Sequence, residues 1–349
     1  MSKRITWGVL GSGGIARRRT LPEGIVPARN ARLVAVFDVN VAANAELAKQ
    51  FGATAAGSLE DLLGAGVEAV YIATPPNVHR EQALACAAAG KHVLCEKPLG
   101  LTVADAQAMI ASCRQAGVRL GTAFMMRCHA QHQAALALIR DGALGQPVFA
   151  RAQLSCWYPL IPGAWRQDPV SAGGGALMDM GGHCIDLLEM FFGPANAVSC
   201  LTNRTVHSYA SEDSAVASLR FASGALGVVD TFFCVPDAAS QNRLELYGSL
   251  GSILAQGTLG QGSAGEMTAF LESGASAYDA RQSRGGSGGV TIAPPAVNTY
   301  RAEIEEFSQA ILDDREPANS AALGLQSQRV LAACYESAKT ARVIHLDPP

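Results

Sequence analysis

The sequence predicts an α/β fold that begins with a doubly wound parallel sheet and continues into a second α/β domain. Two observations support this prediction. Over the first 123 residues, short apolar runs alternate with helical patterns, which is typical of β-α-β units on a parallel sheet. After about residue 145 the strand patterns alternate between apolar and polar residues, as in an antiparallel sheet with one solvated face. We therefore expect two domains, at residues 1–123 and 124–349.

The first domain is predicted to hold five strands separated by helices. The candidate strands are Ile5–Leu10, Arg32–Phe37, Ala69–Thr74, His92–Cys95 and Arg119–Ala123. Helices with apolar residues three and four positions apart are predicted at Val41–Phe51, Asn77–Ala89 and Thr102–Ala116, with a shorter one at Ser58–Leu63. Gly90 and Gly117 are good helix stops, and Ser58 is a suitable N-cap.

The second domain is predicted from strand patterns that are followed by two helices. Alternate residues of Ser214–Phe221 are apolar, which indicates a half-buried strand. Further strands are predicted at Val148–Cys156, Ala225–Cys234, Asn242–Tyr247 and Gly251–Ala255. Residues 257–298 are rich in Gly, Ser, Ala and Pro and are expected to form long loops. Helices are expected at Tyr300–Asp313 and Ala321–Lys339, with a last strand within residues 342–346.

The composition is that of a soluble globular protein, and it argues against several classes of function. The chain is 49% hydrophobic and 16% charged, and its formal net charge of −3 offers no basic surface for nucleic acid or for a membrane. No apolar run approaches the ~20 residues that span a bilayer, and no signal-peptide stretch precedes the first glycines. The nine cysteines form no CxxC pair and are expected to be reduced thiols in a cytoplasmic protein.

A glycine-rich turn follows the first predicted strand. Residues 11–16, Gly-Ser-Gly-Gly-Ile-Ala, have the GxGxxA form of the dinucleotide-binding fingerprint. Gly11 permits the tight turn, Gly13 lets the backbone approach a pyrophosphate, and Ala16 allows close packing of the helix on the strand. The phosphates are expected to be bound at the helix N-terminus by the amides of Ser12, Gly13, Gly14 and Ile15.

An acidic residue stands where this fingerprint requires one. Asp38 ends the second strand, 22 residues past Ala16, where a carboxylate can bond the hydroxyls of the adenosine ribose. It would repel the 2′-phosphate of NADP by about 4 kcal/mol at ~4 Å, and a third of that gives roughly tenfold discrimination. Arg17, Arg18 and Arg19 lie beyond the turn and are expected on a solvated helix face. These features favour NAD, with NADP left possible.

The predicted strand His92–Cys95 ends abruptly in Glu96-Lys97-Pro98. In a doubly wound sheet, ligands bind outside the carboxyl ends of the strands. Thr74-Pro75-Pro76-Asn77 follows the preceding strand at the same edge, so the nicotinamide end of a dinucleotide is expected to reach Lys97. A surface salt bridge is the alternative role for a single lysine in this place.

A second group of polar residues lies in GGGALMDMGGHCIDLL, residues 173–188. Asp179, His183 and Asp186 are spaced so that a helix would present them on one face, and the glycines would let the backbone approach a ligand. A metal site would need ligands from elsewhere, and we expect none. A structural set of caps and salt bridges remains open. We favour an acid/base set, because oxidising a secondary alcohol also removes a proton and a histidine titrates near neutrality.

The glycine turn, the Glu-Lys-Pro motif and the Asp179…His183 segment together resemble the glucose–fructose oxidoreductase/inositol 2-dehydrogenase (Gfo/Idh/MocA) family over nearly the whole chain. The resemblance implies an N-terminal Rossmann domain and a C-terminal α/β domain with a large open, mostly antiparallel sheet. That sheet commonly mediates oligomers in the family, so a homodimer or homotetramer is expected. The resemblance also implies that Lys97 is the catalytic lysine and that Asp179 and His183 complete the active site.

The resemblance implies further binding residues. The stretch ATPPNVH is similar to one that lines the cofactor, and with Glu96 it adds Thr74, Pro75, Asn77 and His79. Trp165 and Arg166 resemble a pair that reaches cofactor or substrate. Arg127 matches a residue in contact with nicotinamide or substrate, although its neighbours Met125-Met126 and Cys128-His129 depart from the family pattern. Tyr158, Arg166 and His207 could also reach the substrate from loops, with His207 favoured as structural.

The expected function is hydride transfer between nicotinamide and a secondary hydroxyl or ketone of a sugar, polyol or sugar derivative, with Lys97 and His183 as acid/base groups. One alternative is an NADP-dependent reductase of a ketosugar such as 1,5-anhydrofructose, because residues 127–147 and the AWRQDP run resemble such reductases. Another is a dinucleotide-binding regulator without turnover, which would be expected to lack Lys97, Asp179 or His183. Neither a nucleic acid nor a membrane is an expected partner.

Overall fold

The computed structural model of the chain describes residues 3–274, 278, 280–281 and 288–348, and it divides into two compact units. Unit 1 comprises residues up to Cys128 with 168–173 and 298–329, and unit 2 comprises 129–167, 174–297 and the residues from Val330 onward. Neither unit is continuous in sequence, unlike the two domains predicted from it. The reason lies in helix α8 (Thr299–Leu312), whose Ile304 and Phe307 are buried in the core of unit 1.

Unit 1 is built on a six-stranded parallel sheet of order β3-β2-β1-β4-β5-β6. Its strands are β1 (Ile5–Leu10), β2 (Ala31–Phe37), β3 (Thr54–Ala55), β4 (Ala69–Ile72), β5 (His92–Cys95) and β6 (Leu120–Thr122). The predicted strands are confirmed to within two residues at each end, and β3 is too short to show a sequence pattern. Strand order reverses on the two sides of β1, which creates the crevice where doubly wound sheets bind ligands.

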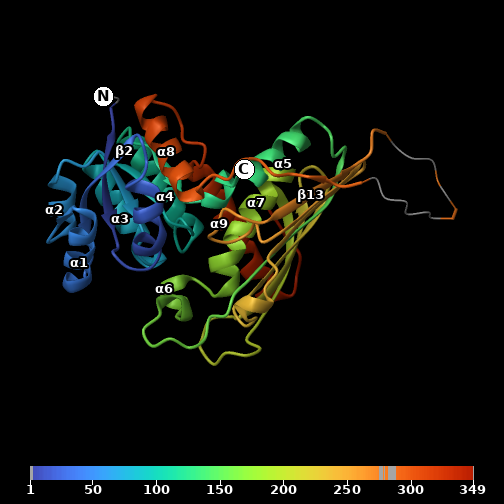
Figure 1. The fold of residues 1–349 in the computed structure, drawn as a ribbon. Coiled ribbons are helices and arrows are strands. Elements are labelled where there is room, and N and C mark those ends of the chain that lie inside the picture. Colours follow the sequence, from blue (N-terminus) through green and yellow to red (C-terminus); the bar gives the residue numbers. More distant parts are fainter. Residues whose placement is uncertain (1–2, 275–277, 279, 282–287, 349) are drawn as a thin grey trace. The chain divides into compact units, whose positions relative to one another are not determined.

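Helices pack on this sheet (mostly blue to cyan in Figure 1, with α8 orange to red), and several of them begin at a capping side chain. The helices of unit 1 are η1 (Ala16–Ile25), α1 (Val41–Phe51), α2 (Leu59–Gly64), α3 (His79–Ala88), α4 (Val103–Gln115), α6 (Pro169–Ala172) and α8. Asn40 and Ser58 accept amide hydrogen bonds as N-caps of α1 and α2, and Thr102 forms a capping box with Asp105. The glycine turn therefore opens a helix, as predicted, although η1 is a π-helical segment.

Apolar residues fill both faces of the sheet in unit 1. Val70 and Ile72 of β4 point into one core, and the alternate residues Ala69 and Tyr71 point into the other. Burial on both faces explains why these strands read as continuous apolar runs rather than as alternating ones. In the second core the indole N–H of Trp7 donates a 3.1 Å hydrogen bond to Ser308 Oγ of α8.

Unit 2 contains a nine-stranded sheet of order β14-β13-β12-β11-β7-β10-β9-β8-β15, and each of its strand pairs is antiparallel except β7 with β10. The strands are β7 (Pro147–Ser155), β8 (Ala195–Asn203), β9 (Ser214–Phe221), β10 (Leu226–Phe232), β11 (Arg243–Gly248), β12 (Gly251–Gln256), β13 (Glu266–Leu271), β14 (Val290–Thr291) and β15 (Ile344–His345). The expected large, mostly antiparallel sheet is thereby confirmed.

The expectation of loops throughout residues 257–298 is wrong for β13 and β14. In β13 only Met267 and Ala269 are buried, so its alternation is too short to stand out among Gly- and Ser-rich neighbours. β13 is a strand because it pairs with β12 along its whole length, and such a pairing cannot be read from the local sequence. Residues 275–277, 279 and 282–287 of the predicted loops lie outside the described residues.

Helices cover one face of the sheet in unit 2. They are α5 (Ala130–Arg140), η5 (Leu177–Gly181), which runs directly into α7 (Gly182–Phe192), and the second part of α9 (Ala321–Thr340). The segment η5–α7 packs against β7 and β10, and Figure 1 shows α7 beside the sheet. In β9, Ala215, Ala217, Leu219 and Phe221 are buried whereas Val216, Ser218 and Arg220 are exposed. The second face of the sheet is therefore open.

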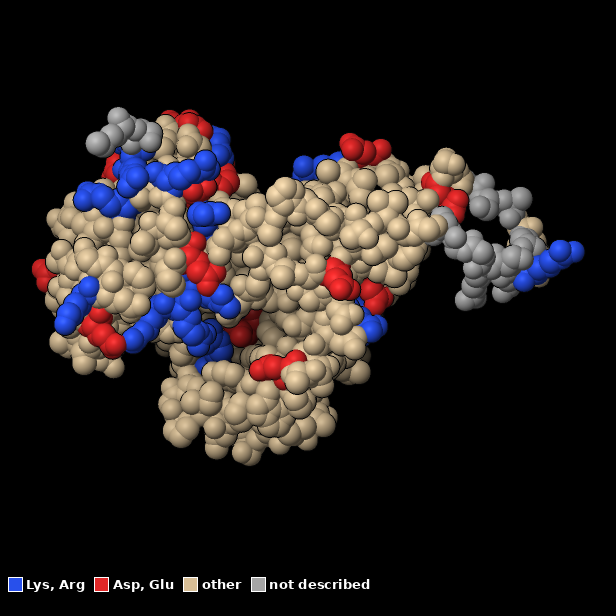
Figure 2. Space-filling view, viewed as in Figure 1, with Lys and Arg blue, Asp and Glu red and all other residues tan. Residues whose placement is uncertain are grey.

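The surface matches the nearly balanced charge of the chain. Basic and acidic side chains are interspersed on the face shown in Figure 2. Several of them pair, including Arg29 with Glu305 and Arg119 with Asp314. Within the described part of the chain, none of the helices combines the length and the apolar character that crossing a bilayer requires.

Ser308→Ala is expected to lower the free energy of unfolding by about 1–3 kcal/mol, because the buried indole N–H of Trp7 loses its acceptor. Alanine is the better helix former, so helix propensity cannot account for such a loss. Urea unfolding measures the change. The loss should be smaller in a Trp7→Phe background, where no N–H needs an acceptor. Equal stability of Ser308→Ala and the wild type would contradict the role of this bond.

Candidate active site

The glycine turn leaves open space where a phosphate could approach. Gly11 has a φ of +93°, and a Cβ there would lie 2.9 Å from the carbonyl carbon of Ala73, so glycine is required at the turn. Around Gly13 and Gly14, by contrast, no heavy atom of the described residues beyond the adjoining chain comes within 4 Å of where a Cβ would be. The backbone of the turn is thus accessible at these two residues.

Asp38 ties this turn to the end of β2. Its Oδ2 accepts a 2.6 Å hydrogen bond from the Ser12 amide, and its Oδ1 accepts a 2.7 Å bond from the Asn40 amide. The Ser12 side chain is buried, and its Oγ has no hydrogen-bond partner among the described residues. Buried hydroxyls are normally satisfied, so this atom fits a polar group of a ligand. An accessible backbone, a buried hydroxyl and a carboxylate at the strand end fit a dinucleotide.

The neighbouring arginines point to other partners. Arg17 forms an ion pair of 2.7 Å with Glu46, and Arg19 forms one of 2.6 Å with Glu23. Arg18 is exposed. These arginines therefore form the solvated helix face that the sequence predicts. The charged side chain that bonds the backbone of the glycine turn is Asp38.

His79 joins the two loops that leave β4 and β5. Its Nε2 lies 2.8 Å from the carbonyl oxygen of Thr74, and its Nδ1 lies 3.0 Å from that of Pro98. The side chain is fully buried, and burial lowers its pKa. Because a neutral imidazole carries one N–H, the ring can donate to either carbonyl. His79 therefore lies between the Thr74–Asn77 loop and Lys97-Pro98 and donates a hydrogen bond to one of the two, whereas the resemblance implied a residue that lines the cofactor.

Tyr71 orients Glu96, the residue that precedes Lys97. The Tyr71 hydroxyl donates a 2.6 Å hydrogen bond to Glu96 Oε1, and Glu96 Oε2 accepts a 3.2 Å bond from the Lys97 amide. Burial, with the nearby carboxylates of Glu96 and Glu303, raises the pKa of Tyr71 far above its usual range, so the phenol remains a donor. Sequence reasoning missed Tyr71. Its signal was a hydroxyl-bearing residue inside the apolar strand AVYI.

Three of the predicted residues of unit 2 come together around Asp179. Its Oδ2 lies 3.3 Å from Arg166 Nε, and the Arg166 guanidinium stacks 4.2 Å from the centre of the Trp165 ring. Burial raises the pKa of Tyr158, which the Arg166 guanidinium opposes and the Asp179 carboxylate reinforces. Tyr158, Arg166 and Asp179 are therefore close enough to influence one another, and Trp165 orients the arginine.

Asp179, His183 and Asp186 were expected on one face of a single α-helix, but the structure places them in two helical segments of different kinds. Asp179 lies in the π-helical segment η5, and His183 and Asp186 lie in α7. A π-helical turn is wider than an α-helical one, so spacing alone does not align its residues with those of the next turn. Asp179 and His183 are half-buried, whereas Asp186 is only 3% exposed and belongs to the core side.

The remaining candidates have separate settings. Arg127 is half-buried in a short helix, η3 (Met125–Cys128), of unit 1. The ring of His207 stacks on Tyr209, and its Nε2 lies 2.9 Å from the carbonyl oxygen of Phe233, which agrees with the structural role favoured for it. Within the described residues, no group of three His, Cys, Asp or Glu side chains is arranged to hold a metal ion.

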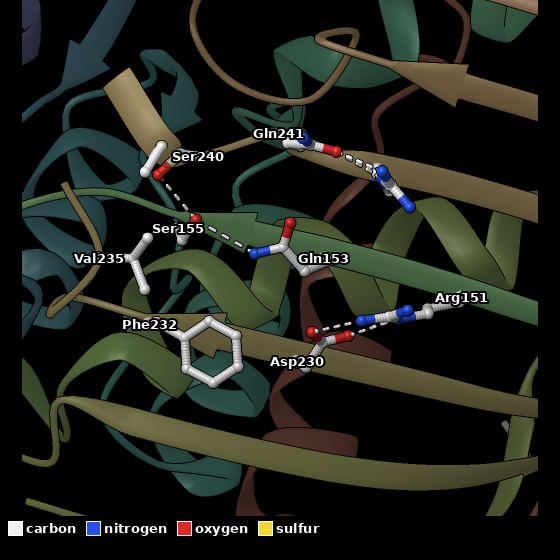
Figure 3. A pocket seen from close by; sticks show the side chains of 10 residues that line it. Arg151, Gln153, Ser155, Asp230, Phe232, Val235, Ser240 and Gln241 are labelled. Carbon is white, nitrogen blue, oxygen red and sulfur yellow. Dashed lines mark hydrogen bonds and ion pairs between the residues drawn. The ribbon is translucent and has the colours of Figure 1, made fainter. Parts of the chain in front are cut away.

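A hollow also lies on the open face of the sheet in unit 2. Figure 3 shows that Arg151 and Asp230 face each other across neighbouring strands, joined by hydrogen bonds of 2.9 and 3.0 Å. Ser155 bonds Gln153 and Ser240 beside them. These polar groups satisfy one another across the strands, so the hollow belongs to the surface of the sheet and shows no catalytic pairing of its own.

Comparisons with known proteins agree over both units. Residues 5–124 match the GFO/IDH/MocA oxidoreductase family with an NAD-binding Rossmann fold, and residues 132–254 match the GFO/IDH/MocA C-terminal domain. The chain is 30% identical over 345 residues to 1,5-anhydro-D-fructose reductase of Ensifer adhaerens, which covers 98% of each chain. It is 32% identical over 255 residues to myo-inositol 2-dehydrogenase of Thermotoga maritima, covering 71% of this chain and 74% of that one.

Solved structures show the same architecture. The aldose-aldose oxidoreductase from Caulobacter crescentus, determined with glycerol, superposes on this chain with a TM-score of 0.86 at 28% identity. The superposition covers 99% of this chain and 100% of the other. The similarity thus extends through the nine-stranded sheet as well as the parallel one.

Proposed function

The chain belongs to the GFO/IDH/MocA family of NAD-binding oxidoreductases, and from that premise we propose that it transfers a hydride between nicotinamide and a secondary hydroxyl or ketone of a sugar, polyol or sugar derivative. One observation carries the proposal. The Thr74 loop and Lys97-Pro98 lie on the two sides of the buried His79 ring at the carboxyl edge of the parallel sheet, the edge at which the glycine turn also lies. A lysine fixed there is suited to proton transfer next to a bound dinucleotide.

In this proposal each residue has a defined task. The amides of residues 13–15 and Ser12 Oγ would hold the pyrophosphate, and Asp38 would bond the adenosine ribose. The Ser12 amide, expected from the sequence to bind phosphate as well, donates to Asp38 instead. When bound, the nicotinamide would supply the hydride acceptor or donor. Lys97 would take the proton from the substrate hydroxyl and His183 would share it, while Asp179, braced by Arg166, would orient the substrate. In the opposite direction the same groups would return the proton to a ketone oxygen.

The names of the relatives support a polyhydroxylated substrate. An anhydrofructose reductase and an inositol dehydrogenase both act on carbon atoms that bear hydroxyl or keto groups. Reduction of a ketosugar such as 1,5-anhydrofructose with NADPH is a specific second candidate, because that relative aligns over 98% of both chains. A regulator without turnover is less favoured, since Lys97, Asp179 and His183 are all present.

Absorbance at 340 nm would test the reaction directly. Purified protein is mixed with NAD or NADP and myo-inositol, D-glucose or D-xylose, and with NADH or NADPH and 1,5-anhydrofructose. Turnover with one pair identifies the cofactor, the direction and the substrate class together. Tight NAD binding without turnover on any compound of this panel would instead favour the regulator.

The thiols support a cytoplasmic location for this activity. All nine cysteines lie in the described part of the chain, and none of them forms a disulfide bond there. Burial raises the pKa of Cys86 to about 12 and that of Cys113 to about 11, so these thiols stay protonated and unreactive. A reducing compartment keeps such thiols free.

The open face of the nine-stranded sheet supports a homodimer or homotetramer. Leu201 and Val216 pair across β8 and β9 on this face and are 74% and 43% exposed. Leu226 is 55% exposed on the same face of β10, the strand that also carries Asp230 of the pair in Figure 3. Apolar side chains around a satisfied polar centre suit the burial of this face against a second copy of the chain.

Lys97→Ala is expected to lower kcat by at least ~10², the usual contribution of an acid/base group, and His183→Gln to lower it by at least ~10. The NAD dissociation constant should change little, because the groups proposed to bind the pyrophosphate and ribose are untouched. Steady-state kinetics and fluorescence titration with NADH measure both quantities. Lys49→Ala, an exposed lysine of the same unit, is the matched control. A wild-type kcat for Lys97→Ala would remove this residue from the mechanism.

Asp38→Ser is expected to raise the ratio of kcat/KM for NADP to that for NAD by about tenfold, because the carboxylate that repels a 2′-phosphate is gone. Both values should fall in absolute terms, since the Ser12 and Asn40 amides lose their acceptors. Asp61→Ser, an exposed aspartate of the same unit, should leave the ratio unchanged. An unaltered ratio for Asp38→Ser would show that this side chain does not face the ribose.

Val216→Arg is expected to shift the protein towards the monomer, because a charge on the open sheet face cannot be desolvated against a second copy. Sedimentation velocity of the wild type and the variant measures the change. Val39→Arg, which alters a valine that is 90% exposed in unit 1, is the matched control. A monomeric wild type at micromolar concentration would contradict the proposed assembly.

A further inference from the structure

We propose that Glu212 is a positioning residue for the reaction: from the connection between β8 and β9 it caps the helical segment that carries Asp179 and His183, and together with Tyr335 it fixes where that segment begins. The inference rests on the function proposed above for Asp179 and His183. Glu212 itself has no assigned contact with substrate or cofactor, so its effect would be exerted through the helix.

The segment Leu177–Phe192 begins without a capping side chain of its own. Ala176 is the N-cap residue, and it follows Gly174 and Gly175, none of which has a polar side chain. Glu212 supplies the missing acceptors: its Oε1 receives a 3.1 Å hydrogen bond from the Leu177 amide, and its carbonyl oxygen receives one of 3.1 Å from the Ala176 amide. A carboxylate at this end also interacts favourably with the helix dipole.

Tyr335 of α9 holds the same carboxylate from the other side. Its hydroxyl donates a 2.8 Å hydrogen bond to Glu212 Oε1, the oxygen that also accepts the Leu177 amide. Burial raises the pKa of Glu212, and the hydrogen bonds from Tyr335 and the amides oppose that rise. Burial and Glu212 raise the pKa of Tyr335 well above its usual range, so Tyr335 remains a donor.

Two of the three consecutive glycines are explained by these contacts. A Cβ at Gly175 would overlap the carbonyl oxygen of Glu212, and a Cβ at Gly174 would overlap the Tyr335 hydroxyl. From the sequence these glycines were expected to let the backbone approach a ligand. At Gly174 and Gly175 they instead let the backbone approach Glu212 and Tyr335, and Gly173 ends α6 with a φ of +80°.

Glu212 is itself held firmly by the residue that follows it. The Asp213 carboxylate accepts hydrogen bonds from the amides of Thr205, Val206 and His207, and its carbonyl oxygen accepts one of 2.7 Å from Phe233. The cap is therefore anchored to the sheet, and the helix start is anchored to the cap. Asp179, which contacts Arg166, lies two residues after Leu177, whose amide Glu212 caps. Loss of the cap would displace Asp179 first and His183 next, and a shift of about 1 Å can cost roughly 10²-fold in rate.

The test compares Glu212→Ala and Tyr335→Phe with Glu212→Gln, which keeps an amide oxygen as acceptor. Ser337→Ala is the matched control: its buried hydroxyl bonds the Cys200 amide and the Arg342 carbonyl, and among the described residues it makes no hydrogen bond to residues 174–183. Turnover is followed at 340 nm with the compound of the panel that the wild type uses. The ring ¹⁵N–¹H signals of His183, assigned by their loss in His183→Gln, are recorded for every variant.

Glu212→Ala should lower kcat by about 10- to 10²-fold, with NAD binding unchanged within about twofold, and should shift the His183 ring signals. Tyr335→Phe should give a smaller loss, and Glu212→Gln should restore kcat to within about threefold of the wild type, since one acceptor remains. Ser337→Ala should lower the melting temperature but leave kcat and the His183 signals unchanged.

Wild-type kcat and unshifted His183 signals in Glu212→Ala would overturn the positioning role, whatever happens to the melting temperature. Failure of the positioning role can be told apart from failure of the proposed function. If His183→Gln retained full turnover, the acid/base role of His183 would fail, whereas the ring signals in Glu212→Ala would still report whether Glu212 positions the helix.

Discussion

Several segments that carry candidate site residues leave buried elements, and some of their backbone polar groups lie away from water and need partners within the protein. The structure satisfies them with side chains from elsewhere in the chain. Asp38 bonds the amide of Ser12, His79 reaches the carbonyls of two loops, and Glu212 bonds the amide of Leu177. An unpaired buried backbone group costs about 1–3 kcal/mol, so these bonds fix the loops strongly. The same side chains that stabilise the fold thereby set the geometry of the site.

This constraint explains why the site residues lie at the ends of elements. Lys97 follows β5, Asp38 follows β2, and Asp179 lies in the first turn of its helix. Strand and helix ends are where hydrogen-bonding groups are left over by the regular structure. A ligand, a cap or a neighbouring loop can use them. In unit 1, open space over Gly13 and Gly14 leaves amides available, whereas in unit 2 Glu212 occupies the corresponding end of the helix.

Local features of the fold could be predicted from the sequence because adjacent residues determine them. The cap Ser58 and the tight turn at Gly11, where φ is positive, depend on neighbours a few positions away. Partners far apart could not be predicted: the Glu212–Tyr335 bond spans 123 positions and the Trp7–Ser308 bond spans 301. The periodicity of apolar residues indicates that a residue is buried, but it does not identify the distant residue that it contacts. For the same reason β13 was missed and α8 was not assigned to the parallel sheet.

The arrangement also explains how one scaffold can serve relatives named as dehydrogenases and as reductases. If Lys97 carries the proton as proposed, it works in either direction, since it would accept a proton from an alcohol or return one to a ketone. The buried hydrogen bonds fix the backbone of the loops, and they do not involve the side chains proposed to contact the substrate. Tyr158 and Arg166, by contrast, project from the segment between β7 and η5, outside the regular elements of unit 2 that position Asp179. Under the proposed function, a change at Tyr158 would therefore leave the Glu212–Leu177 hydrogen bond intact, whereas a change at Arg166 would also remove its contact with Asp179.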